Sequence, residues 1–328
     1  MKIRALVAGF AMLLASVFLA IAFGAESISL GRAVSEPGSL DRTIVLSARL
    51  PRVLLGALAG GGLAAVGVAF QTLLRNPLAE PYILGVSGGA ALGATVAILF
   101  GIATTTFLGA SVVPLAALGG GLAATAVVYG LAHVTRAAYA TSILLAGVVV
   151  NAITSAAITF LKTLVSAAKA QELLFWLMGF LDVPSPAALA SVTVYVAIGG
   201  AMLLVDAGRL NLLALGDEPA QHLGVDVRAL ERRTFFACSL VVGGIVSVTG
   251  LIGFIGLIVP HALRRLFGPD VRVILPASLF AGGGLLILCD LISRTLFRFL
   301  HTEPPVGAVT ALLGGPLFLV LLGRRQRV

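Results

Sequence analysis

The segment 85–89 reads GVSGG and matches G-x-S-x-G, a pattern in which a sharp turn presents a serine as a nucleophile. Such chemistry needs a histidine as general base, oriented by a carboxylate. The histidines of the chain are His133, His222, His261 and His301. None has a neighbouring carboxylate arranged to orient it, and the motif is flanked by apolar, helix-like sequence instead of a strand and a helix. We therefore interpret Ser87 as a packing residue at a helix start, with a serine protease as an alternative, and expect no catalytic residue.

A nucleotide-binding loop would read G-x-x-x-x-G-K-[ST], with glycines that let backbone N–H groups surround the phosphates. Lys162 is followed by Thr163, but Leu161 stands where the loop requires glycine. The chain therefore lacks this loop, and we expect it to bind no nucleotide or other cofactor. If ATP drives this protein, a separate subunit must bind it.

A pair of opposite charges lies inside an apolar stretch. Asp290 precedes Arg294 by four residues, a spacing that places both on one face of a helix, where they can pair. Charges in such segments mark either a functional site or a structural pair. The two cysteines, Cys238 and Cys289, lie in apolar runs without metal-ligand spacing, so we expect small buried side chains and no metal site.

The composition shows what kind of element must hold these residues. The 328-residue chain is 59% hydrophobic and 11% charged, with 39 glycines and a mean hydropathy of +1.09. A water-soluble protein of this composition would expose large apolar patches, so lipid is the expected solvent. The net charge of +8 comes from basic flanks of membrane spans, because no basic run is long enough for nucleic acid.

Uncharged windows of about 20 residues mark the expected spans. We predict an all-α, polytopic membrane protein with one domain over 1–328, about ten spans and both termini cytoplasmic, in the bacterial inner (plasma) membrane. The window 5–25 is too long for a signal peptide and is taken as the first span. The window 81–135 must hold two spans, with a break near 101–109. The others are 53–74, 137–161, 183–205, 234–263, 273–289 and 304–323.

The window 234–263 has arginines at both ends, so we expect both ends in the cytoplasm and two short spans that turn near 249–253. The order of spans then suggests an inverted repeat of 49–162 and 231–328. This topology leaves several arginines outside, against the usual orientation of charge. They are Arg32, Arg42, Arg49, Arg52, Arg294 and Arg298.

The longest cytoplasmic segment is 206–233, and it contains LGDEPAQHLGVD. Asp217 is a suitable N-cap, Pro219 suits the first turn and Gly224 can end a helix of less than two turns. Gly56 and Gly60 form a G-x-x-x-G pair in the second span, which indicates close helix packing or a position beside a path.

Several strings together resemble the FecCD family of ABC-transporter permeases, which import iron–siderophore complexes, haem and cobalamin. They cover nearly the whole chain in the expected order. The strings are RLPRVL (49–54), RNPLAEPYILGVSGGA (75–90), ATSILLAGVVVN (140–151), FWLMG (175–179), LGDEPAQHLGVDV (215–227), GLIGFIGLIVPHALR (250–264) and PPVGAVTALLGGPLF (304–318).

The resemblance implies ten spans per subunit, a homodimer with the path between its two copies, two cytoplasmic ATPase subunits that carry ATP and Mg, and an extracytoplasmic substrate-binding protein. It further implies roles for individual residues. Arg49, Arg52 and Arg294 would receive acidic residues of the binding protein, and Thr141 and Ser142 would narrow the cytoplasmic gate. Residues that line the path or pack beside it would be Gly56, Gly60, Asn76, Pro77, Leu78 and Ser87.

The cytoplasmic string would be the coupling helix, which sits in a cleft of the ATPase. Its residues are Leu215, Gly216, Asp217, Glu218, Pro219, Ala220, Leu223 and Gly224. A bulky side chain at Ala220 should then clash with that cleft.

The cargo would be a large metal chelate. A ferric siderophore or haem is the first expectation, with cobalamin as the alternative. An ion-coupled carrier is a further alternative, but it would need ionisable residues at mid-membrane.

Overall fold

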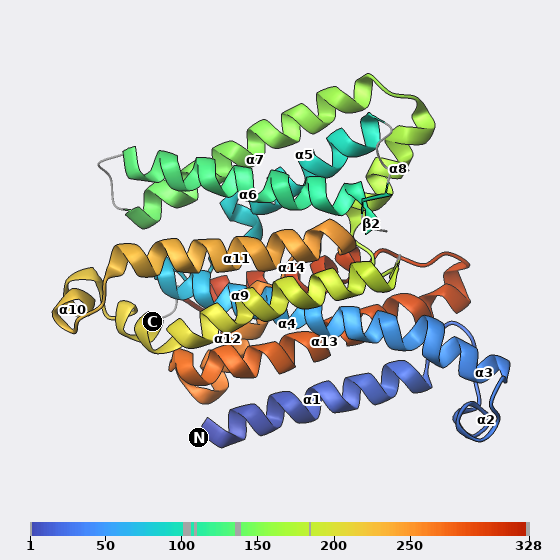
Figure 1. Ribbon diagram of the computed structural model, residues 1–328. Helices are drawn as coiled ribbons and strands as arrows, with labels where there is room; N and C mark the ends of the chain where they lie inside the picture. The colour runs from blue at the N-terminus through green and yellow to red at the C-terminus, as the bar shows by residue number, and fades with distance from the viewer. Residues whose placement is uncertain (1, 101–105, 108–109, 135–138, 184, 326–328) are drawn as a thin grey trace.

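The computed structural model describes the chain except for residues 1, 101–105, 108–109, 135–138, 184 and 326–328. It is a bundle of helices that lie roughly parallel or antiparallel to one another (Figure 1). Each predicted span corresponds to a helix. These are α1 (Lys2–Ala22), α4 (Leu50–Leu73), α5 (Val86–Leu99), α6 (Val112–Val134), α7 (Tyr139–Thr163), α9 (Pro186–Leu213), α11 (Val227–Thr249), α12 (Ile255–Phe267), α13 (Val271–Leu300) and α14 (Val306–Arg325).

Short elements occupy the two ends of the bundle and the breaks between helices. They are α2 (Leu30–Ser35), α3 (Leu40–Thr43), a π-helical turn (Ile44–Arg49), a 3₁₀ turn (Pro81–Leu84), α8 (Ala167–Met178) and α10 (Asp217–His222). Strands β1 (Thr106–Phe107) and β2 (Ala110–Ser111) form a small antiparallel pair at the predicted break between α5 and α6. The prediction of an all-α membrane protein is confirmed.

Seven helices of the described chain are long and apolar enough to cross a membrane. The other three predicted spans are α5, α12 and α14. The described apolar stretches of α5 (Val86–Leu99) and α14 (Val306–Pro316) are shorter, and α12 has only 13 residues. At about 1.5 Å per residue, the 14 residues of α5 and the 13 of α12 reach only about 20 Å. Helices α5 and α12 are short because the segments before them, 74–85 and 250–254, do not continue them as regular helix. The break predicted near 249–253 is therefore confirmed.

The two halves of the chain share an order of elements. In each, a long helix is followed by a break, a short helix and two further helices: α4 to α7, and α11 to α14. In Figure 1, α4 starts at the end of the bundle where α3 lies, whereas α11 starts at the opposite end, beside α10. This order and opposite direction match the predicted inverted repeat. Figure 1 also shows α1 beginning and α14 ending at the α10 end.

Helix α4 is the centre of the fold, since 83% of the residues in its most apolar stretch are buried, against 22% in α1. It packs most extensively on α13, and α1 covers the outer side of α13. The segment predicted as the loop 206–233 is shorter in the structure. Helix α9 continues through Leu213 and α11 begins at Val227, which leaves 214–226 as the connection.

Candidate functional site

The connection between α9 and α11 forms α10, a short helix that projects from one end of the bundle (Figure 1). The N-cap is Gly216, with φ 130°, and Asp217 is the first helical residue, so the prediction of Asp217 as N-cap is wrong. A glycine with positive φ begins the turn in its place. Gly224 has φ +82°, and its N–H donates to the carbonyl of Gln221 at 2.9 Å. Gly224 therefore ends the helix in the left-handed conformation, as predicted.

Helix α10 has one buried face and one exposed face. Ala220 is completely buried, and its carbonyl accepts a hydrogen bond from Val225 N–H at 3.0 Å. A bulky residue at Ala220 would thus disturb the seating of α10 on its own chain, so the expectation that it would probe a partner's cleft is wrong. The exposed face carries Leu215 (65% exposed) and Leu223 (58%), together with Asp217, Glu218 and Pro219. Exposed apolar side chains of this size at a turn suit contact with another protein.

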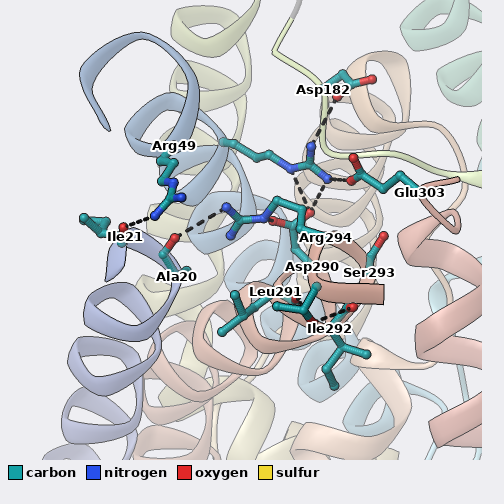
Figure 2. Close-up of polar contacts among 12 residues, drawn as sticks. Ala20, Ile21, Arg49, Asp182, Asp290, Leu291, Ile292, Ser293, Arg294 and Glu303 are labelled. Atoms are coloured by element: carbon teal, nitrogen blue, oxygen red, sulfur yellow. Dashed lines mark hydrogen bonds and ion pairs between the residues drawn. The ribbon is translucent and has the colours of Figure 1, made fainter. Parts of the chain in front are cut away.

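At the opposite end of the bundle, Arg52 lies among the carboxylates of Asp182, Asp290 and Glu303, which are labelled in Figure 2. Its Nε and Nη2 donate to Asp290 Oδ1 at 2.9 and 2.7 Å. Nη2 also contacts Glu303, and Nη1 lies 3.6 Å from Asp182. Sequence reasoning missed Glu303 and Asp182, because nothing in their local sequence links them to a residue so far away. The predicted pair is confirmed, with Arg294 Nε 2.9 Å from Asp290 Oδ2.

Arg49 and Arg294 are directed toward the end of α1 (Figure 2). Arg49 donates to the carbonyls of Ile21 at 2.6 Å and Glu26 at 2.5 Å, and Arg294 donates to that of Ala20 at 3.4 Å. The exposed fractions of Arg49 and Arg294 are only 4% and 6%. The structure therefore brings the three predicted docking arginines together, but as part of a largely buried, internally bonded cluster.

A cavity of about 470 Å³ opens beside this cluster. It is lined by Ala25, Glu26, Ile44, Ser47, Ala48, Arg49, Arg52, Leu181, Asp182, Val183, Arg294 and Glu303. Arg49 shows no carboxylate partner within the described chain, whereas Arg52 is surrounded by them. The positive charge of this site is therefore already partly neutralised before any carboxylate group of a partner arrives.

Thr141 and Ser142, the predicted gate residues, lie in the first turn of α7, which begins at the α10 end of the bundle (Figure 1). The side chain of Thr141 lies outside the described residues. Ser142 is buried, and its Oγ has no hydrogen-bond partner among the residues that the structure describes. The gate role of both residues stays a prediction.

The glycines of α4 serve close packing. A Cβ on Gly60 would lie 2.2 Å from the carbonyl oxygen of Gly282 in α13, so only glycine fits this approach. A Cβ on Gly56 would lie 3.2 Å from Ile287 of the same helix. The packing interpretation of this pair is supported by the geometry.

The segment after α4 is held by its own side chains. Asn76 Oδ1 accepts a hydrogen bond from Leu78 N–H at 3.0 Å, which closes a turn around Pro77. Ser87 Oγ donates to the carbonyl of Tyr82 at 3.2 Å, and Ser87 is buried at the start of α5. These contacts agree with packing roles for Asn76, Pro77, Leu78 and Ser87.

Comparison with known proteins explains these features together. The model of the FecCD transport family matches residues 12–324. The chain belongs to the FecCD transport family. It is therefore a membrane permease subunit of the ABC-transporter type, and the resemblance noted from its strings is confirmed.

Among relatives of this FecCD chain, a cobalamin import system permease protein, BtuC, from Halobacterium salinarum is 41% identical over 87% of the chain and 74% of that protein. A hemin transport system permease protein, HmuU, from Yersinia pestis is 38% identical, over 86% and 84%. A solved structure described as an inward-facing, metal-chelate type ABC transporter matches with a TM-score of 0.84 and 29% identity, over 98% of this chain and 99% of that one.

Proposed function

We propose that this FecCD chain is the membrane-spanning subunit of an ABC importer for a large metal chelate, a ferric siderophore, haem or cobalamin. Two copies form the path between them, two separate ATPase subunits dock on the cytoplasmic side, and a substrate-binding protein delivers cargo from outside. The chain itself binds no nucleotide or cofactor. The observation that carries the proposal is the match of the family model over residues 12–324, together with relatives that import haem and cobalamin.

The two ends of the bundle support this division of partners. Helix α10 offers exposed Leu215 and Leu223 beside acidic residues, a surface suited to a protein cleft. The opposite end offers the arginine cluster and its cavity, which suit an acidic partner. In alternating access, closure of the ATPase dimer would move α10 and shift the opening of the path from one side to the other.

The test is uptake into liposomes that contain the chain, its ATPase and its binding protein. Haem, a ferric siderophore and cobalamin are offered separately, with and without ATP and with vanadate as inhibitor. We expect ATP-dependent, vanadate-sensitive uptake of one of the three. Uptake driven by an ion gradient without any ATPase would refute the proposal and support a carrier. Hydrolysis of a peptide that is lost on Ser87→Ala would support the protease.

A further inference from the structure

The residue that follows α4 has an unusual backbone. Arg75 adopts φ +47°, one of three non-glycine residues with positive φ in the described chain. At this position, just beyond a helix C-terminus, glycine is preferred, because the Cβ atom of any other residue strains the left-handed backbone. Contacts made by the Arg75 side chain can offset this cost.

These contacts reach α10 and the helix before it. Arg75 Nη2 forms an ion pair with Asp217 Oδ1 at the start of α10, and Nε donates to the carbonyl of Leu213 at the end of α9, at 3.3 Å. Arg75 and Asp217 are 42% and 51% exposed, so the pair adds little to folding stability. It does connect α10 directly to the segment 74–85.

The same segment is bonded at its far end to the break between α11 and α12. The carboxylate of Glu80 accepts from Phe254 N–H at 2.5 Å, and Tyr82 Oη accepts from Ile252 N–H at 2.7 Å. The carbonyl of Tyr82 accepts from Asn151 Nδ2 of α7 at 2.8 Å. The segment 74–85 therefore touches the break at 250–254 and α7, the helix that carries Ser142.

We propose that Arg75 is a positioning residue that helps to couple ATP hydrolysis by the partner subunit to transport by this chain. It ties α10 to the segment 74–85, and this segment passes displacement of α10 to α7 and to the break at 250–254. The proposal rests on the proposed function, since it assumes that an ATPase moves α10. Its geometry is the Asp217–Arg75 ion pair at one end of the segment and the hydrogen bonds of Glu80 and Tyr82 at the other, joined by the backbone between them.

The chain offers a well-matched set of variants. Arg75→Gly removes the side chain and relieves the positive φ, so the protein should fold at least as well as the wild type. Arg75→Asp with Asp217→Arg reverses the pair and keeps it. Arg272→Ala is the control, because it breaks the exposed pair of Arg272 with Asp270 (3.1 Å), which does not involve α10.

The experiment measures three quantities in liposomes with the ATPase and binding protein: ATPase association, ATP hydrolysis, and cargo taken up per ATP hydrolysed. We expect Arg75→Gly to keep association and thermal stability but to lower uptake per ATP by about two- to fivefold, the factor an exposed ion pair supplies. The reversed pair should restore most of the uptake per ATP, and Arg272→Ala should give the same uptake per ATP as the wild type. Hydrogen exchange at 250–254 should respond to ATPase docking in the wild type but not in Arg75→Gly.

Unchanged uptake per ATP in Arg75→Gly would overturn the proposal. The proposal would also be overturned if the loss of uptake came with misfolding or ATPase release and the reversed pair did not rescue it. Arg75 would then have only a structural role. A wild-type chain that binds no ATPase would refute the proposed function itself, and this outcome is visible before any variant is compared.

Discussion

Asp290 is the acidic centre of the arginine cluster, and its neutralisation gives a sharp test of the structure. The carboxylate is 1% exposed and accepts from Arg52 at 2.9 and 2.7 Å, with Arg294 2.9 Å away. Asp290→Asn keeps the size of the side chain but leaves two buried guanidinium groups without this counter-charge. Removing one partner from a buried ion pair costs about 3–5 kcal/mol. We expect the melting temperature in detergent to fall by roughly 5–15 °C.

The matched control is Asp182→Asn. Asp182 contacts the same Arg52, but at 3.6 Å and with a side chain that is 80% exposed. An exposed pair of this kind contributes about 0.2–1 kcal/mol, so the control should melt close to the wild type. Adding Arg294→Gln to Asp290→Asn should recover part of the lost melting temperature, because it removes one of the two positive charges left without a partner. Equal melting temperatures for the two single variants would refute our account of a buried, coupled cluster.

Three further predictions follow from single positions. Gly60→Ala should lower stability by about 1–3 kcal/mol by forcing α4 off α13, whereas Gly200→Ala, where a Cβ meets nothing within 4 Å, should be neutral or stabilising in the same melting assay. Gly224→Val should strain a backbone at φ +82° by about 1–2 kcal/mol and lower cargo-stimulated ATP hydrolysis, with insertion unchanged. Glu303→Gln should free positive charge on Arg52 and strengthen capture of an acidic binding protein by up to about fivefold, measured by pull-down; weaker capture would contradict this.

Local patterns predicted much of the fold. The lengths of the uncharged windows predicted every long helix, and the arginines around 234–263 predicted the break that the structure has at 250–254. The Asp290–Arg294 pair followed from helical spacing alone, and Gly224 from the chemistry of helix ends. These features depend on neighbours a few residues apart, which is why the sequence is sufficient for them.

Features that join distant segments were decided only by the tertiary structure. Arg52 meets Glu303 across 251 positions, and Arg75 meets Asp217 across 142, and no local pattern shows either pair. Ala220 lies in an exposed-looking polar segment, yet packing of α10 on its own chain buries it completely. Amino-acid type and spacing determine which residues can be helical, apolar or charged. Which charges neutralise one another, and which face of a short helix remains free for a partner, depends on how the helices pack.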